Sequence, residues 1–345
     1  MPGCIDRCST RPAYAAALAR PMTRAARAAM DFVTALDTGR LGRLLGCCAP
    51  AATWWVDTGP DRPGGEPAVS PAGSGRFPLH GLMGLADKLD LMRDLGPQAF
   101  PTGCRQIPRR VIAGDLDCVI EVEGFGVHAS GATYANRYGF VFDVDRRGLI
   151  TSVREYLDTI HAQQVVGAGT PLPPSATLDG GDRRPALAAR ATRSPAAQRA
   201  LALWPALARG DLDGFAEQFH PDAHFWTDSG RDRVRGRLDG RGDARANGPF
   251  HGRVPIADKL AVMRERIRAA GYTTPGITVT PHRLIADGNL VAIEASGDAR
   301  LGEHAYQNRY LWVIDADAAG IREVREYCDT LHLAVLHGAR GEYAD

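Results

Sequence analysis

The stretches Tyr134-Ala-Asn-Arg-Tyr138 and Arg154-Glu-Tyr-Leu-Asp-Thr-Ile-His161 occur a second time in this chain, with small changes. The second copies are Tyr306-Gln-Asn-Arg-Tyr310 and Arg325-Glu-Tyr-Cys-Asp-Thr-Leu-His332. Self-similarity of this kind is typical of a repeated structural unit. The sequence therefore predicts two copies of one fold, and the question becomes what one copy does.

The similarity extends over nearly the whole of both halves. Trp54-Trp-Val-Asp57 corresponds to Phe225-Trp-Thr-Asp228, and Ala86-Asp-Lys-Leu89 corresponds to Ala257-Asp-Lys-Leu260. The matched stretches keep their order along the chain, which indicates that whole domains correspond rather than isolated motifs.

Four segments follow from this comparison. Residues 1–23 match nothing in the second half, and we expect a disordered or non-native extension there. Residues 167–195 are rich in Gly, Pro, Ala and Arg without an apolar period, which is typical of a flexible linker. The remaining residues, 24–166 and 196–340, are predicted to form two domains of ordinary size.

Composition excludes several classes of partner. With 41 basic and 40 acidic residues the chain is nearly neutral, so nothing indicates a nucleic-acid groove or an anionic membrane surface as its partner. The sequence has neither an apolar run near the roughly 18 residues that span a bilayer nor an apolar signal segment near residue 1. Seven cysteines without CxxC spacing indicate reduced thiols. A cytoplasmic protein is predicted.

Each half shows the same order of elements. Residues 25–45 and 200–219 carry apolar side chains at helical spacing, and further helices are predicted at 85–95 and 256–269. The later part of the first half alternates as strands separated by turn residues, at 109–112, 118–123, 133–144 and 149–156. Helices followed by an antiparallel meander predict an α+β fold, with helices packed on one face of a curved sheet.

These motifs resemble one known family. The Trp-containing strand, His80-Gly81 before a helix, the Tyr-x-Asn-Arg-Tyr strand and the closing Arg-Glu-Tyr-x-Asp-Thr are similar to the SnoaL-like branch of the nuclear-transport-factor-2-like superfamily. That branch includes ketosteroid-isomerase-related proteins, polyketide cyclases and limonene epoxide hydrolase. The resemblance implies that each half is a cone-shaped α+β barrel, with a pocket between the helices and a mostly antiparallel sheet.

The resemblance also implies how the two copies are arranged. Single domains of this fold pair through the outer face of the sheet, and fusion makes that pair intramolecular. We therefore expect an intrachain pseudo-dimer, with further homo-oligomerisation left open. Because this fold carries enzymes and binding modules alike, the chemistry must be argued from particular residues.

Glu155 and Glu326 are the principal catalytic candidates. On a strand Glu155 shares its face with Val153 and Leu157, and burial beside such neighbours would make a carboxyl a usable general acid or base. Glu326 repeats this arrangement. In the epoxide-hydrolase relative an acidic residue at the matching position is catalytic. The alternative is a structural ion pair with an Arg of a neighbouring strand.

Glu121 and Glu294 are expected to assist them. If Glu121 and Glu155 face one cavity, the two carboxyls would couple and act as an acid/base pair. The alternative is that Glu121 neutralises Arg137 or Arg154 in a buried network.

Two further pairs are expected to orient a substrate. Asp57 and Asp228 follow the tryptophans, where they could hold a substrate hydroxyl or accept its proton, or simply form turns. Trp55 and Trp226 are expected in the pocket wall.

The remaining candidates lie beside a helix start and on the repeated strand. His80 and His251 precede a Gly, where a general base or a loop-fixing role is possible. Three side chains share one strand face and would contact substrate if that face is inward, or form the seam between the halves if it is outward: Tyr134, Asn136 and Tyr138, repeated as Tyr306, Asn308 and Tyr310. Asp158 and Asp329 are predicted helix caps.

The sequence contains no phosphate-binding Gly-rich loop, GxSxG elbow or nucleotide fingerprint. It therefore predicts chemistry without a cofactor or a metal. With the resemblance, it predicts an acid/base enzyme acting on a hydrophobic, oxygenated small molecule, as a polyketide-type natural-product cyclase, isomerase, dehydratase or epoxide hydrolase. The alternative is a non-catalytic binding or assembly protein that uses the same pocket.

Overall fold

The computed structural model of the protein describes residues 22–56, 81–167, 187, 194–227, 252–269, 276–301 and 304–330. Four of the predicted site residues, Asp57, His80, Asp228 and His251, lie outside these ranges. The predictions for them stay predictions.

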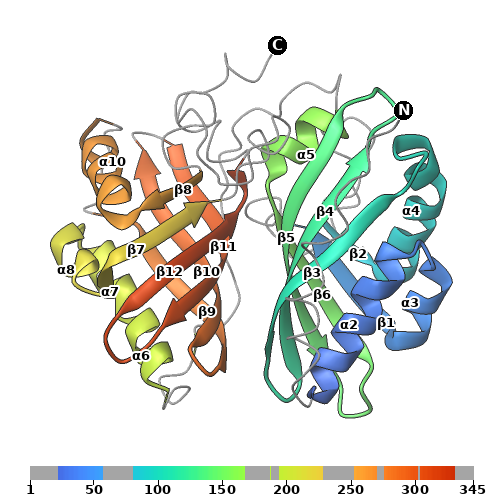
Figure 1. Ribbon diagram of the computed structural model, residues 1–345, viewed down its shortest axis with the longest axis horizontal. Helices are drawn as coiled ribbons and strands as arrows, with labels where there is room; N and C mark the ends of the chain where they lie inside the picture. Colours follow the sequence, from blue (N-terminus) through green and yellow to red (C-terminus); the bar gives the residue numbers. More distant parts are fainter. Residues whose placement is uncertain are drawn as a thin grey trace.

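The first half is one mixed sheet with helices on one face (Figure 1). Its strands lie in the order β2-β1-β6-β5-β4-β3, and all neighbours are antiparallel except β1 and β6. The elements are α2 (Arg24–Asp37), α3 (Leu41–Cys47), β1 (Cys48–Val56), β2 (Gly81–Gly84), α4 (Leu85–Ala99), β3 (Cys104–Ala113), β4 (Asp117–Val127), β5 (Thr133–Val144), β6 (Ile150–Leu157) and α5 (Thr159–Val165).

The second half has the same strand order, β8-β7-β12-β11-β10-β9, again with one parallel pair, β7 and β12. Its elements are α6 (Pro195–Leu201), α7 (Leu203–Ala208), α8 (Leu212–Ala216), β7 (Phe219–Thr227), β8 (Gly252–Pro255), α10 (Ile256–Ala269), β9 (Thr278–Asp287), β10 (Leu290–Leu301), β11 (His304–Ala316) and β12 (Ile321–Cys328). The predicted α+β fold in two copies is confirmed.

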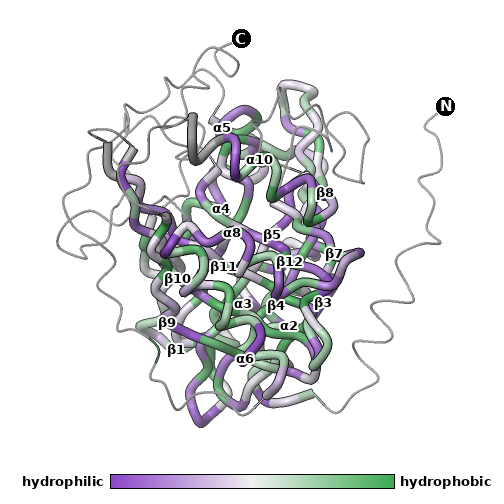
Figure 2. The backbone as a smooth tube through the Cα atoms, turned by 90° about the vertical axis from the view of Figure 1, so that its left-hand side faces the viewer, coloured by the Kyte–Doolittle hydropathy of each residue, from purple (hydrophilic) through white to green (hydrophobic). Residues whose placement is uncertain are grey.

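The opening helices differ from their predicted extent. Helix α2 is largely apolar (Figure 2) and is capped by Thr23, whose hydroxyl accepts a hydrogen bond from the backbone N–H of Ala26. The single helix predicted at 25–45 ends early because Gly39 adopts a φ of 65°, a left-handed conformation that stops an α-helix. In the second half, the predicted helix at 200–219 is three short helices.

Each sheet has two buried faces. On β4 the inner side chains Cys118, Ile120 and Val122 pack against the helices of the first half. The outer side chain Val119 instead packs against the sheet of the second half. The outer-face cluster between the halves consists of Trp55, Ile112, Val119, Val141, Tyr156, Trp226, Ile285, Ala292, Leu311, Val313 and Tyr327.

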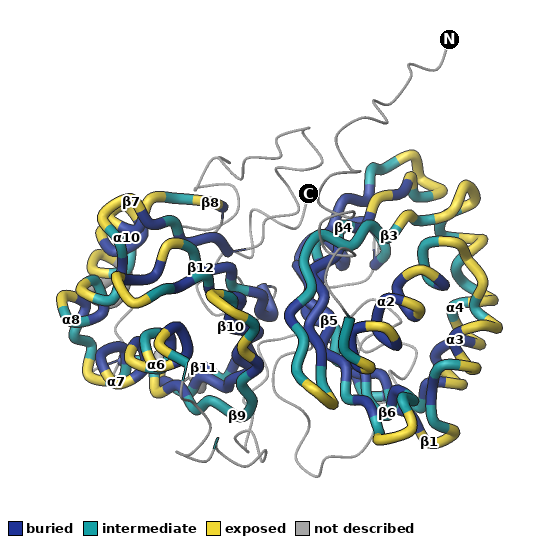
Figure 3. The backbone as a smooth tube through the Cα atoms, turned by 60° about the horizontal axis from the view of Figure 1, so that its bottom comes forward, coloured by how far each residue is buried: buried dark blue, intermediate teal, exposed yellow. Residues whose placement is uncertain are grey.

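The two sheets therefore face each other across the centre of the molecule, with their helices on the outside (Figure 1). Burial follows this arrangement: β5 and β11 are largely buried where the halves meet, whereas helices such as α4 and α8 expose one side (Figure 3). The predicted intrachain pseudo-dimer is confirmed. Among the described residues, no helix combines the length and apolar character required to cross a membrane.

Candidate functional site

Glu155 lies inside the first half, as its strand pattern predicts. The side chain is 12% exposed, and its neighbours Val153 and Leu157 belong to the inner core. Glu155 Oε2 accepts a hydrogen bond of 2.8 Å from the indole Nε1 of Trp54 and lies 3.4 Å from Lys88 Nζ. The carboxylate is thus held inside an apolar barrel by one neutral and one cationic donor.

Glu326 occupies the corresponding place in the second half. Its Oε2 accepts 3.0 Å from Trp312 Nε1, and its Oε1 accepts 2.9 Å from the hydroxyl of Thr227. Lys259 Nζ in turn donates to the same hydroxyl oxygen over 3.1 Å. Both halves therefore hold a glutamate, an indole donor and a lysine in one interior cluster.

The indole donor comes from different strands in the two halves. In the first half it is Trp54 of β1, and in the second it is Trp312 of β11. At the position matching Trp54 the second half has Phe225, and at the position matching Trp312 the first half has Phe140. The tryptophan and the phenylalanine have exchanged strands, yet the hydrogen bond to the carboxylate is kept.

This exchange makes a prediction about stability. Trp312→Phe should lower the free energy of unfolding by about 2 kcal/mol, because it removes a donor to a charged acceptor. The double variant Trp312→Phe, Phe225→Trp should recover part of that loss by placing the donor on β7, as in the first half. Chemical denaturation measures both. Equal stability of the single and double variants would contradict the structural equivalence of the two donors.

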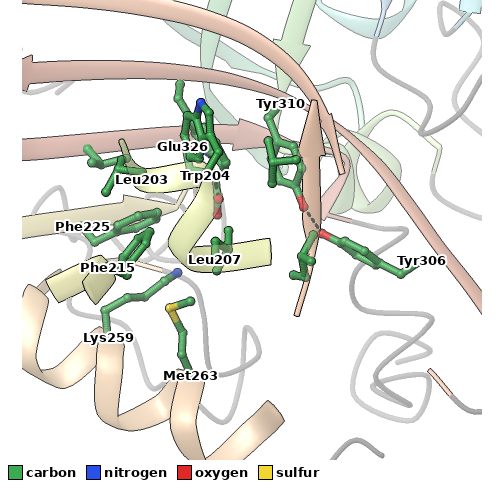
Figure 4. Close-up of a pocket in the computed structure, with 14 residues that line it drawn as sticks. Leu203, Trp204, Leu207, Phe215, Phe225, Lys259, Met263, Tyr306, Tyr310 and Glu326 are labelled. Carbon is green, nitrogen blue, oxygen red and sulfur yellow. Dashed lines mark hydrogen bonds between the residues drawn. The ribbon is translucent and has the colours of Figure 1, made fainter. Parts of the chain in front are cut away.

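A cavity opens between the helices and the sheet of the second half, with Glu326 in its lining (Figure 4). It encloses about 710 Å³, the open space at its mouth included. Most of its lining is aliphatic or aromatic, and the polar groups are Lys259, Glu326, two phenols and the N–H groups of two indoles. The full lining is Leu203, Trp204, Leu207, Phe215, Phe225, Lys259, Met263, Ile277, Val279, Tyr306, Tyr310, Trp312, Val324 and Glu326.

The repeated Tyr-x-Asn-Arg-Tyr strand points its tyrosines inward. Tyr306 and Tyr310 line the cavity and hydrogen-bond each other through their hydroxyls, and the Tyr138 hydroxyl donates 2.8 Å to that of Tyr134 in the first half. Burial raises the pKa of Tyr310 well above its ordinary value, so its phenol stays neutral.

The asparagine of this strand contacts backbone instead. Asn136 donates from Nδ2 to the carbonyl of Asp158 over 3.0 Å, and its Oδ1 accepts from the N–H of the same residue. Asn308 makes the same two bonds with Asp329. Both asparagines therefore hold the junction that follows the closing strand.

Glu121 and Glu294 do not share a cavity with Glu155 and Glu326, so this prediction is wrong. Arg325 of the second half makes a forked ion pair with Glu121, whose Oε1 also accepts 2.7 Å from the Tyr327 hydroxyl. Arg154 of the first half makes the reciprocal fork with Glu294, at 2.7 and 2.9 Å. These carboxylates lie on the outer faces of the sheets, where they join the two halves.

The placement of Trp55 and Trp226 in the pocket wall is also wrong. Both belong to the cluster between the halves, where Trp55 meets the Tyr156 ring edge-on at 5.2 Å. Consecutive residues on a strand face opposite ways, so Trp54 turns inward and Trp55 outward. The guanidinium of Arg309, from the second half, lies over the Trp55 ring at 5.2 Å.

Asp158 caps helix α5, as predicted. Its Oδ1 accepts from the N–H of Ile160 at 3.1 Å, and it also accepts 2.6 Å from the Thr330 hydroxyl of the second half. The Thr159 hydroxyl donates reciprocally to Asp329 over 2.6 Å. The cap is therefore also a crossed contact between the halves, which the sequence pattern alone does not indicate.

Residues 198–333 match the SnoaL-like domain. The resemblance predicted from the motifs is thereby confirmed for the second half, which carries the cavity. None of the curated protein sequences matches the chain.

The solved structures that are similar to one half of this chain include the following three, each with low sequence identity. An NTF2-like protein of unknown function from Burkholderia pseudomallei is 18% identical over 43% of this chain and 100% of its own, with a TM-score of 0.34. An LEH-like epoxide hydrolase of M. tuberculosis is 18% identical over 43% and 94%, with a TM-score of 0.30. A putative polyketide cyclase from Xanthomonas campestris pv. campestris is 19% identical over 42% and 95%, at 0.30.

Two site residues were missed by the sequence analysis, Lys259 of the SnoaL-like half and Lys88 of the first. Both lie in helices whose repeated Ala-Asp-Lys-Leu motif is visible in the sequence, but no role was assigned to the lysine. The sequence does contain a signal for them, because Lys88 and Lys259 are the only lysines in the chain. A long cationic side chain at a core-facing helix position in both copies indicates a buried partner.

Burial lowers the pKa of Lys88 to about 8, against the opposing charge of Glu155. Below pH 8 the lysine is protonated in folded and unfolded chains alike, and folding then carries the full cost of burying the charge. Between pH 8 and about 10.5 the folded chain binds fewer protons, so its stability rises with pH.

The reference is the double variant Lys88→Met, Glu155→Gln. We expect the unfolding free energy of the wild type, measured relative to this variant, to rise by on the order of 2 kcal/mol between pH 7.5 and pH 10. The double variant serves as the reference because it removes both charges, whereas tyrosines and cysteines titrate equally in both proteins. Denaturation at several pH values measures the difference. A difference that is flat or falls with pH would contradict the lowered lysine pKa.

Proposed function

We propose that the cavity of the second half is the active site of a cofactor-independent acid/base enzyme. The observation that carries the proposal is Glu326: a carboxylate in a mostly apolar lining, oriented by an indole N–H and a hydroxyl. A positioned carboxylate can take a proton from a bound molecule and return it at another atom. Glu155, held by the indole of Trp54 and the amine of Lys88, is proposed for the same role in the first half.

The lining supports a hydrophobic, oxygenated substrate. Aromatic side chains such as Phe215 and Trp204 suit apolar rings, while Tyr306 and Tyr310 offer neutral phenols to a ligand oxygen. Lysine and glutamate are the charged groups in the lining, so one polar end of the substrate would lie between them. A polyketide-type natural product fits this description.

Several reactions are compatible with one carboxylate and one amine. Aldol-type cyclisation, isomerisation, dehydration and epoxide opening each require one proton to leave and one to arrive. We propose a cyclase or isomerase of this class, in which Glu326 moves the proton and Lys259 stabilises oxygen that becomes negative in the transition state.

The test uses 2-tetralone, an apolar ring ketone, as a probe in D₂O. The wild type should accelerate deuterium incorporation beside the carbonyl, as followed by NMR, and Glu326→Gln should reduce that acceleration at least about 100-fold. The quenching of tryptophan fluorescence by the probe reports whether binding is retained. Glu155→Gln measures the contribution of the first half.

Glu265→Gln is the matched control, since Glu265 is an exposed glutamate on α10 of the same half. It should leave the exchange rate unchanged. Equal rates in the wild type and in the double variant Glu155→Gln, Glu326→Gln would overturn the acid/base assignment. Binding without acceleration by the wild type would indicate a non-catalytic binding protein.

A further inference from the structure

We propose that Lys259 is a covalent site, whose amine forms an imine with an aldehyde or ketone bound in the cavity. The inference rests on the proposed function in that it uses the same cavity. It adds a second reacting group and narrows the ligand to a carbonyl compound. Neither the family match nor the predicted acid/base pair contains this step.

The first observation is the use of lysine in this chain. Of its 41 lysines and arginines, only Lys88 and Lys259 are lysines, and both lie in the interior, 2% and 5% exposed. Arginine keeps its proton in proteins and does not act as an amine nucleophile. The chain thus has its lysine amines at two equivalent interior positions and nowhere on its surface.

The second observation is the place of the amine. Lys259 extends from α10 into the cavity toward Phe215 and Phe225 (Figure 4), and its Nζ lies 4.4 Å from the centre of the Phe225 ring. The cavity gives a ligand access to this nitrogen, which is otherwise screened from solvent. Ring-bearing ligands that fill the aromatic lining would bring a carbonyl carbon beside it.

The third observation is the proton carrier next to it. Thr227 Oγ1 accepts from Lys259 Nζ and donates to Glu326 Oε1, so one hydroxyl joins the amine to the carboxylate. Burial lowers the pKa of Lys259, although the negative charge of Glu326 opposes this effect. A desolvated lysine has a larger neutral fraction at neutral pH, and only the neutral amine is nucleophilic.

The step balances without an oxidant or a reductant. The Nζ lone pair attacks the carbonyl carbon, and the electron pair of the C=O π bond moves to oxygen. Glu326 accepts a proton from the nitrogen and delivers it to that oxygen. Solvent supplies a second proton to the hydroxyl group, which leaves as water while the nitrogen lone pair forms the C=N bond of a protonated imine. The remaining N–H proton then passes to Glu326 and back to solvent, which restores the proton that was consumed. Amine and carbonyl give imine and water, and hydrolysis reverses the step.

Lys88 is an internal control. Its Nζ contacts the Glu155 carboxylate directly at 3.4 Å and lies 4.0 Å over the Trp54 ring. Both contacts favour the protonated form, whereas burial lowers the pKa of Lys88 to about 8, so protonation alone does not separate the two lysines. They differ in access, because Lys259 lines the cavity of the second half and Lys88 does not line it. In the second half the Thr227 hydroxyl bonds both the amine of Lys259 and the carboxylate of Glu326.

The experiment treats the full chain with 2-naphthaldehyde and sodium cyanoborohydride at pH 7.5. Chymotryptic peptides then identify each reduced adduct by mass. We expect Lys259 to be modified at least tenfold faster than Lys88, with a rate that saturates in aldehyde concentration. Lys259→Arg should abolish that adduct and leave labelling of the terminal amine unchanged. Circular dichroism checks the fold of the variant, and 2-methylnaphthalene, which has no carbonyl, should slow labelling of Lys259 in the wild type by competition.

Labelling of Lys259 that is no faster than labelling of Lys88, or that does not saturate, would overturn the imine. The 2-tetralone assay distinguishes this failure from failure of the proposed function. If exchange still depends on Glu326 while no adduct forms at Lys259, the imine is overturned and the acid/base enzyme stands. If exchange does not depend on Glu326 and no adduct forms at Lys259, both the acid/base enzyme and the imine are overturned.

Discussion

Arg325→Met is expected to lower the free energy of unfolding by about 3–5 kcal/mol, as measured by chemical denaturation. Arg325 pairs through its guanidinium fork with Glu121, which is buried at 5% exposure between the halves. Without Arg325, the carboxylate loses its forked partner and keeps the longer 3.6 Å pair with Arg110 while remaining out of water, so its desolvation is less well offset. Adding Glu121→Gln should recover most of the loss, because the amide oxygen can still accept from the Tyr327 hydroxyl.

The stability lost in Arg325→Met should also depend on pH. Burial raises the pKa of Glu121 to about 7, against the opposing charge of Arg110. A carboxyl with a raised pKa binds its proton more readily in the folded chain, so stability falls as pH rises from about 4.5 through 7. Removal of the Arg325 cation should raise the pKa of Glu121 further, so the stability that Arg325→Met loses relative to the wild type should be larger at pH 8 than at pH 5.

The exposed pair of Arg322 and Asp317 provides the control, since the arginine side chain is 57% exposed. Arg322→Met should change stability by less than about 1 kcal/mol. An equally small loss in Arg325→Met would show that the crossed ion pairs contribute little to holding the halves together.

Gly139→Leu is expected to cost about 3 kcal/mol, at the upper end of the range for overpacking. A Cβ at Gly139 of β5 would collide with Leu311 Cδ2 of β11, across the contact between the halves. Leu311 is fully buried and stands at the position of the second half that corresponds to Gly139. One half therefore supplies the side chain and the other supplies the space at the same position.

Exchanging the two residues provides the decisive comparison. Leu311→Gly alone should cost about 2–5 kcal/mol by opening a cavity, but in combination with Gly139→Leu it should restore most of the stability. Double-mutant analysis of denaturation curves measures the coupling. Additive losses would mean that the two positions do not fit one another as described.

Much of the fold could be predicted from repeated motifs and periodicity. Strand alternation placed Glu155 among inner neighbours, and Asp158 before Thr159 read as the helix cap that the structure contains. These patterns are local, and the physical rule that governs each acts within a few residues.

The errors share one cause. Both faces of each sheet are buried, one by helices and one by the opposite half, so an apolar or aromatic residue does not reveal which way it points. Glu121 and Trp55 were therefore assigned to the pocket although they lie on the outer face. Which face is which depends on contacts between residues far apart in the chain, such as the 2.7 Å bond from Arg154 to Glu294.

The indole that donates to the interior glutamate comes from different strands in the two halves, and this affects how relatives of this chain should be aligned. A column-by-column alignment of the halves scores Trp54 against Phe225, and Phe140 against Trp312, as two unrelated aromatic replacements. The shared quantity is a donor at one point in space, which either of two neighbouring strands can supply. Relatives that lack a tryptophan at one of these columns should be searched at the other before the carboxylate is judged to have lost its donor.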